Sequence, residues 1–273
     1  MAALHVDDYG GPGEPLLFIH GWGMHGGMWG GVLDELNKQH RVLAVDLPGH
    51  GYSNRSGDRG SRSEEQGASG EQNAALDAIV DQLAAQFSDV EALTVCGWSL
   101  GGQIALRWAM RHPDRVKRLV LVSSTPCFVQ QADWQCAMHA DILAAFAAAL
   151  RQDYAATLRR FLALQVRGSE QEREQLATLR SSLQSRGEPD MAALEAGLGI
   201  LRNADLRMEL AKIGTPVLVI GGVRDTLTPM QASEYMAAHL PAAQLATIAG
   251  AAHAPFLSHR AEFVKHVADF LHE

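Results

Sequence analysis

Short apolar runs alternate with amphipathic stretches along most of the chain. Five runs are rich in Val, Leu and Ile and end in turn residues: 15–21, 41–49, 92–99, 117–124 and 215–222. Such runs lack in/out alternation, which favours central parallel strands covered on both faces. Helical spacing of apolar residues lies between them, as in 72–87 and 101–113. This order predicts an α/β fold with a mostly parallel, doubly wound sheet.

Two stretches interrupt the alternation. Residues 53–73 contain almost no apolar side chain, which predicts a solvated excursion. From 127 to 203 the strand pattern is absent. Apolar residues recur there at helical spacing, and Ser169 with Glu172 fits a capping box. A helical insertion between late strands would lie over the carboxyl edge of the sheet, where open α/β sheets bind ligands. We therefore predict a core of 1–126 and 204–273 and a helical lid of 127–203.

Composition narrows the class of protein. The chain has 273 residues, 47% of them hydrophobic, enough for one substantial core. Its net charge of -8 gives no reason to expect nucleic-acid binding. No apolar stretch approaches the ~20 residues that span a bilayer, and no secretion signal is evident. The three cysteines cannot all pair and lack metal-type spacing, which is typical of reduced thiols in a cytoplasmic protein.

The stretch "VCGWSLGGQIAL" supplies a candidate nucleophile. Gly97 to Gly101 match G-x-S-x-G between an apparent strand at 92–96 and an apparent helix at 102–111. In that setting glycines allow a sharp turn that raises the central serine into the cleft. Ser99 is therefore predicted to be the nucleophile rather than part of a simple glycine-rich turn.

A serine hydroxyl needs a base, and the base needs an acid. In this architecture the chain order is serine, acid, histidine. Asp225 follows the run 215–222 and is the candidate acid, whereas Asp46 precedes the serine and has a turn-forming setting. His253 lies in a loop of small residues after the strand-like 243–249; His259 is a weaker rival. No H-E-x-x-H or Cys/His cluster is present, so no catalytic metal is expected.

A tetrahedral intermediate also needs backbone N–H donors aimed at its oxyanion. One should be the amide of Leu100, directly after the nucleophile. The other should come from the loop after the first apolar run, where "FIHGWGM" supplies Trp22. The Trp22 indole, between two glycines, is also expected to line a substrate pocket.

The sequence motifs resemble those of a known family. Over nearly its full length the chain resembles the α/β-hydrolase superfamily, through "IHGWGMHGGMW", "VDLPGHGYS", "GWSLGG" and "AAHAPFLSHRAEF". Within it, "SSTPCF" followed by Trp134, and "RFLALQ", are similar to BioH-type carboxylesterases. Members of that group cleave the methyl ester of pimeloyl-[acyl-carrier protein] in biotin synthesis.

The resemblance implies an α/β-hydrolase fold, a triad of Ser99, Asp225 and His253, no cofactor, and an acyl-carrier protein bearing the ester as partner. It implies no membrane or nucleic-acid partner, and we expect a monomer. The implied substrate contacts are Trp22, Ser99, Leu100, Phe161, Leu162, Ala163, Leu164, Gln165 and His253.

The predicted lid is locally basic although the chain is acidic. Residues 151–186 contain seven arginines and four acidic residues. These arginines are 151, 159, 160, 167, 173, 180 and 186. By default we expect these arginines to form a solvated helical face. The more specific hypothesis is that they form a docking surface for an acidic carrier protein. Arg160 and Arg173 match positions where the resembled group uses arginine for carrier contact.

Other functions keep the same motifs. The triad does not distinguish this esterase from a broad short-chain ester hydrolase, or from a C–C or lactone hydrolase, because fold and nucleophile do not set the acyl group. A non-catalytic small-molecule receptor on the same scaffold is a further alternative, disfavoured by the intact Ser-Asp-His set. A haloalkane dehalogenase would need Asp where Ser99 stands.

Overall fold

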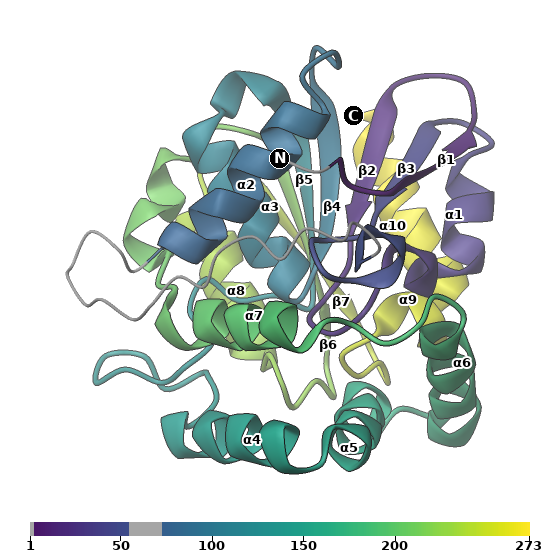
Figure 1. Cartoon of the computed structure of the whole chain (residues 1–273). Coiled ribbons are helices and arrows are strands. Elements are labelled where there is room, and N and C mark those ends of the chain that lie inside the picture. The colour runs from purple at the N-terminus through teal and green to yellow at the C-terminus, as the bar shows by residue number, and fades with distance from the viewer. Residues whose placement is uncertain (1–2, 55–72) are drawn as a thin grey trace.

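A seven-stranded sheet lies at the centre of the computed structural model, which describes residues 3–54 and 73–273 (Figure 1). The polar stretch predicted to be a solvated excursion lies outside the described residues over 55–72. Strand order is β1-β3-β2-β4-β5-β6-β7, and only the edge strand β1 runs antiparallel. The bounds are β1 (Val6–Gly10), β2 (Pro15–Ile19), β3 (Arg41–Val45), β4 (Leu93–Trp98), β5 (Val116–Val122), β6 (Val217–Gly222) and β7 (Ala243–Ile248). The predicted mostly parallel sheet is confirmed.

Strand β2 illustrates why the apolar runs carry no polar alternation. Leu17 and Ile19 pack into one hydrophobic cluster, while Leu16 and Phe18 pack into a second cluster on the other face of the sheet. All four are at most 1% exposed. Full burial of such a side chain is worth about 2 kcal/mol, so every position of the strand favours the same buried placement.

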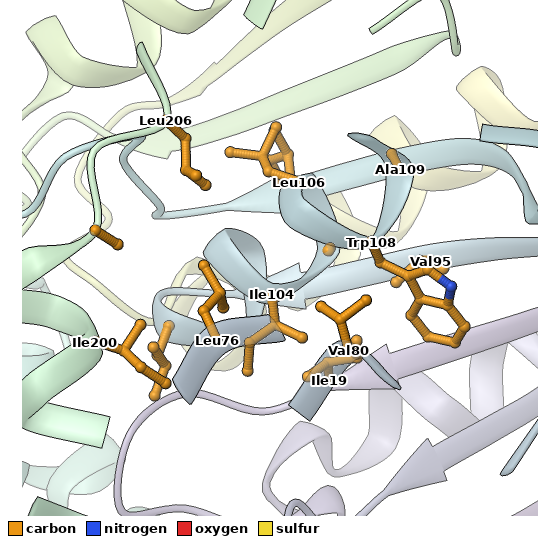
Figure 2. Packing of buried hydrophobic residues seen from close by; sticks show 14 of the residues in the cluster. Ile19, Leu76, Val80, Val95, Ile104, Leu106, Trp108, Ala109, Ile200 and Leu206 are labelled. Atoms are coloured by element: carbon orange, nitrogen blue, oxygen red, sulfur yellow. The ribbon is translucent and has the colours of Figure 1, made fainter. Parts of the chain in front are cut away.

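Helices cover both faces of the sheet. Figure 2 shows one face, where Val80 and Ile104 pack over Ile19 and Val95. The helices of this face are α2 (Ala74–Gln86), α3 (Leu100–Arg111) and α8 (Met230–His239), and those of the other are α1 (Gly31–Leu36), α9 (Pro255–Ser258) and α10 (Arg260–His272). Short 3₁₀ turns are η1 (Gly26–Trp29), η2 (Gly51–Asn54), η3 (Pro113–Arg115) and η4 (Arg207–Lys212).

Four helices lie between β5 and β6 in the chain and below the carboxyl edge of the sheet (Figure 1). They are α4 (Ala140–Gln152), α5 (Tyr154–Val166), α6 (Glu172–Gln184) and α7 (Met191–Asn203). We call residues 127–203 the helical insertion. Side chains start two of these helices: Asp153 accepts from the Ala156 amide at 2.9 Å, and Asp190 accepts from the Ala192 amide at 2.7 Å. Such caps satisfy amides that the first helical turn leaves unpaired.

The predicted capping box at Ser169 is wrong in detail. Helix α6 begins at Glu172, with Gln171 at the cap position and no side-chain cap. The Ser169 hydroxyl instead donates to Gln175 at 2.7 Å, because Ser169 is buried and points into the insertion. Glu172 does reach back, but to the Gly168 amide at 3.0 Å.

A buried ion-pair cluster ties the insertion to the core. Arg186, between α6 and α7, donates to both carboxylate oxygens of Asp46 at 3.0 and 3.1 Å and also pairs with Asp7. The Asp46 side chain is fully buried, and it also accepts from the Gly26 amide at 2.6 Å and the Tyr52 amide at 2.8 Å. Arg186 therefore anchors the insertion and is not part of an exposed basic surface, contrary to its place in the predicted arginine-rich face.

Among the described residues, no helix has both the length and the apolar character required to cross a bilayer.

Candidate active site

The turn between β4 and α3 presents Ser99. Its backbone has φ 56° and ψ -117°, a strained combination for a residue with a side chain. The Ser99 amide donates to Val122 of the neighbouring strand at 2.9 Å, and its carbonyl accepts from the Ser124 hydroxyl at 2.8 Å. These bonds hold the strained turn in place, which is the conformation expected of a nucleophile elbow.

Two glycines of the motif are required by close backbone approach. A Cβ atom on Gly97 would lie 2.3 Å from the Gly101 carbonyl oxygen, and one on Gly101 would lie 2.3 Å from the Ile19 carbonyl oxygen. Neither backbone atom can give way without moving β2 or α3. The G-x-S-x-G pattern is thus a consequence of how tightly the turn packs between strand and helix.

Asp225 and His253 are brought together across the carboxyl ends of β6 and β7. The Asp225 Oδ2 atom lies 2.7 Å from His253 Nδ1, and both side chains are almost fully buried. Asp225 Oδ1 accepts from the backbone amides of Leu227 at 2.8 Å and Thr228 at 3.0 Å. The Thr228 hydroxyl donates to Oδ2 at 2.7 Å. These donors hold the carboxylate in one orientation, so it can fix the imidazole with its proton on Nδ1.

The loop that carries His253 is fixed from two sides. The indole N–H of Trp98 donates to the His253 carbonyl at 2.8 Å, and the His253 amide donates to the Gln165 carbonyl of α5 at 3.1 Å. The rival His259 stands at the start of α10 and bonds the Ser258 hydroxyl at 2.9 Å instead of a carboxylate. Only His253 of the two lines the same cavity as Ser99.

That cavity is almost wholly apolar and lies between the sheet edge and the insertion. Of the predicted contacts, Trp22, Ser99, Phe161, Leu164 and His253 line it. Sequence reasoning did not find several further lining residues, which come from 127–146, α7 and the loop after β6: Phe128, Met138, Leu143, Phe146, Leu198 and Leu227. The apolar helical spacing of α4 was visible in the sequence, but not which element it would face.

The remaining predicted substrate contacts lie elsewhere. Leu162 is buried against Leu158 and Val166 in the core cluster on the opposite side of α5. Ala163 and Leu100 are not among the cavity-lining residues, and Gln165 is buried and contributes its carbonyl to the His253 loop. Helix α5 thus presents two of its five predicted contacts to the cavity.

The two predicted oxyanion donors flank the nucleophile. Leu100 follows Ser99 directly, and the loop holding Trp22 passes so close that a Cβ on Gly21 would lie 3.3 Å from the Ser99 Cβ. Within residues 3–54 and 73–273, neither the Trp22 nor the Leu100 amide donates a hydrogen bond. His20 shapes the loop, since its Nδ1 bonds the Gly21 carbonyl at 2.8 Å and its Nε2 accepts from the Leu47 amide at 2.9 Å.

Three buried histidines lie behind this loop. Burial is the main cause that lowers the pKa of His20, His25 and His50 from the usual value of 6.5. The rings of His20 and His50 are 5.2 Å apart, and His25 Nε2 bonds the Ser182 carbonyl of α6 at 2.8 Å. All three are therefore neutral in the folded protein near pH 7.

We expect the free energy of unfolding to decrease when the pH is lowered from 7.5 to 5.5. In the unfolded chain these histidines take up protons below about pH 6.5 that the folded protein does not bind, so the stability present above that pH is lost as the pH falls. Each can contribute up to about 1 kcal/mol over this range, so the upper limit is on the order of 3 kcal/mol in total. Urea titrations at the two pH values measure the difference.

The variant His50→Gln provides the comparison for this pH dependence. It removes one titrating group, and the drop in stability between the two pH values should shrink by up to about 1 kcal/mol. Equal midpoints of urea unfolding at pH 7.5 and 5.5 in the natural chain would contradict the assignment of these three rings as neutral and buried.

The arginines predicted to meet a carrier are on the outside of the insertion. Arg160 of α5 and Arg173 of α6 are exposed, and neither forms an ion pair with another described residue. Arg151, by contrast, pairs with Glu195 of α7 at 2.7 Å. In the described parts of the chain, no group of three His, Cys, Asp or Glu side chains is placed to hold a metal ion.

The chain is similar over nearly its full length to known hydrolases. A family model described as the alpha/beta hydrolase fold matches residues 14–260. The pimeloyl-[acyl-carrier protein] methyl ester esterase of Nitrosomonas europaea is 45% identical over 97% of this chain and 98% of its own. The protein of the same name from Nitrosospira multiformis is 39% identical over 99% and 98%. An esterase structure from Exiguobacterium antarcticum superposes with a TM-score of 0.81, at 22% identity over 99% of this chain and 96% of its own.

Proposed function

The chain belongs to the alpha/beta hydrolase fold family, and on this basis we propose that it is a serine carboxylesterase that hydrolyses the methyl ester of pimeloyl-[acyl-carrier protein] to pimeloyl-[acyl-carrier protein] and methanol, a step of biotin synthesis. The 45% identity over nearly the full chain to a relative with that name carries the proposal. The site supports it, because Ser99 and His253 line one cavity and His253 is held by Asp225.

In this proposal the reaction proceeds in two acyl-transfer steps. The Ser99 hydroxyl attacks the ester carbonyl carbon while His253 Nε2 takes its proton. The imidazolium that forms faces Asp225 at 2.7 Å, which stabilises its charge. Methanol leaves with the proton from His253, and a water molecule then gives a proton to His253 and attacks the acyl-enzyme. The products are the free carboxylate end of the chain and regenerated Ser99.

The oxyanion of each tetrahedral intermediate is assigned to the amides of Trp22 and Leu100. Leu100 is the first residue of α3, a helix of 12 residues, so the positive end of its dipole also faces the developing charge. The strained backbone at Ser99 supports this assignment, since the turn directs the hydroxyl and the following amide toward the same point.

The cavity lining supports an uncharged acyl chain. Apart from Ser99 and His253, the residues lining it are apolar, and a charged chain end would lose its hydration there without a partner. A methyl ester linked to its carrier carries no charge along the chain, so it can enter. We propose that the carrier stays outside against Arg160 and Arg173, with residues 127–203 acting as the lid over the chain.

The place of action is part of the same proposal. Cys96, Cys127 and Cys136 are free, which supports a reducing compartment such as the cytoplasm. Action as a monomer stays a prediction, as does the absence of a cofactor.

Charge reversal at the proposed docking surface tests carrier binding separately from ester hydrolysis. We expect Arg160→Glu to lower kcat/KM for the carrier-bound methyl ester by about tenfold, because a charge mismatch slows the encounter with an acidic carrier. The loss should diminish at high salt, and hydrolysis of p-nitrophenyl butyrate should not change. Methanol release and p-nitrophenolate release measure the two reactions.

Lys117→Glu is the matched control for this charge reversal. It makes the same change in charge at the start of β5, the edge of the sheet opposite the nucleophile, where Lys117 pairs with Glu14. We expect normal turnover of both substrates. An equal loss in the two variants, or none for Arg160→Glu, would count against docking at Arg160.

The same assays test the substrate assignment. Methanol release from the carrier-bound ester with a much higher kcat/KM than p-nitrophenyl butyrate supports the proposal. Efficient cleavage of short esters with no methanol release would indicate a broad ester hydrolase instead. Binding of the ester with negligible turnover would indicate a receptor built on this scaffold.

A further inference from the structure

Helix α7 of the insertion touches both residues whose amides are assigned to the oxyanion. A Cβ atom on Gly197 would lie 2.7 Å from Trp22 Cδ1, 3.2 Å from Trp22 Nε1 and 3.4 Å from Leu100 Cδ2. Only a residue without a side chain fits between this helix and the side chains of Trp22 and Leu100. The contact joins segments that are far apart in the chain, and Gly197 itself is buried.

One turn earlier, the same helix bonds the Trp22 indole. The Trp22 Nε1–H donates to the Leu194 carbonyl at 2.9 Å, and Leu194 is fully buried. A helix carbonyl normally accepts from the amide four residues later, so its second lone pair is used here to hold a side chain of the core. The indole is thus fixed to α7 by a directional bond at 194 and by close packing at 197.

On its other side the indole packs against two phenylalanine rings that line the same cavity. Phe161 of α5 meets the Trp22 ring edge-on with centroids 4.9 Å apart, and Phe146 of α4 does so at 5.4 Å. Trp22 is only 2% exposed. An indole displaced from α7 would therefore meet these two rings, and its backbone would have to move instead.

We infer that Gly197, with the Leu194 carbonyl, is a positioning residue that sets the Trp22 and Leu100 amides at the distance the oxyanion requires. This inference rests on the proposed function and adds to it a residue outside the triad, the donors and the cavity lining. Helix α7 acts on the reaction through these two amides and does not touch the substrate at this point. A donor misplaced by about 1 Å costs on the order of 10²-fold in rate.

The test compares two glycines of one helix. Gly197→Ala places a methyl group against Trp22, whereas at Gly199 no atom lies within 4 Å of the added methyl. Both changes raise helix propensity by about 1 kcal/mol. We expect Gly199→Ala to keep its kcat on p-nitrophenyl butyrate and to gain in Tm. We expect Gly197→Ala to lose about 30–100-fold in kcat with a small change in KM.

A boronic acid supplies a readout that a structural role would not move. An alkyl boronic acid forms a tetrahedral adduct on Ser99 and places an oxygen between the two amides, as the intermediate does. Gly197→Ala should weaken its binding by about the same factor as kcat. Because neither assay uses the carrier, both results can be read even if the methyl-ester assignment fails.

A double variant decides whether the effect passes through Trp22. Trp22→Ala keeps the backbone amide at 22 and removes Cδ1 and Nε1, the two indole atoms that the new methyl group would meet. The kcat of Gly197→Ala with Trp22→Ala should equal that of Trp22→Ala alone, the non-additivity expected of residues in contact. Additive losses, or a Gly197→Ala variant within twofold of the natural kcat, would overturn the inference.

Discussion

Replacing Ser99 with alanine is expected to lower kcat for release of methanol, and of p-nitrophenolate, by about 10⁴–10⁶-fold. The change removes the attacking oxygen but leaves the cavity, the amides of Trp22 and Leu100, and the Asp225–His253 pair in place. Substrate binding should persist, so the carrier-bound ester should still associate with the variant. Single-turnover mixing with mass spectrometry checks the result, because the natural enzyme should carry an acyl group on Ser99.

Ser123→Ala provides the matched control for this substitution. Ser123 is the other serine among the described residues with a positive φ, at 43°, and it is buried at the end of β5, one strand away from the elbow. Its hydroxyl has no hydrogen-bond partner in the described part of the chain. We expect kcat of this variant to match the natural enzyme. If Ser99→Ala retained a tenth of the natural kcat, the assignment of the nucleophile would be wrong.

Asp225→Asn is expected to lower kcat by about 10⁴-fold although it preserves shape. The Leu227 and Thr228 amides both donate to Oδ1, so the carboxamide must keep its oxygen there and turn its NH₂ group toward His253. The NH₂ group can only donate to Nδ1, which moves the imidazole proton to Nε2. An imidazole protonated at Nε2 cannot accept the proton of Ser99.

The free energy of unfolding tells this tautomer effect apart from a loss of structure. The carboxamide introduced by Asp225→Asn would keep both backbone bonds, and the Thr228 hydroxyl can rotate to accept from the new NH₂ group. We therefore expect the midpoint of urea unfolding to change little. A variant with near-natural kcat would show that Asp225 does not orient His253.

The elements that sequence alone predicted well are those governed by local patterns. The apolar runs that became β2 to β6 contain residues that must be buried on alternate faces, and no other placement satisfies all of them at once. The nucleophile elbow could likewise be predicted from the sequence, because contacts within and beside the turn require Gly97 and Gly101. Asp225 and His253 followed from the order in which strands end at one edge.

The phase of the helical insertion could not be predicted in this way. Residues 161–165 are all compatible with a lining helix by sequence, but only Phe161 and Leu164 face the cavity, and Leu162 faces the core. That phase depends on anchors such as the Gln165 carbonyl on the His253 amide and Arg186 on Asp46, which join residues 88 and 140 positions apart. For the same reason the sequence does not distinguish Arg186 from the surface arginines around it.

Sequence by itself determined the order along the chain of the strands β2 to β7 and the helices between them, the turn at Ser99 and the identities of the three side chains proposed to react. The tertiary structure alone decided what surrounds them: the three donors on Asp225, the rings against Trp22, and the glycine of α7 beside both amides. The physical reason is the separation along the chain over which each effect acts. Burial periodicity and turn strain involve residues a few positions apart, so the local sequence is enough to predict them. Close packing depends on the position of chain segments that meet only after folding.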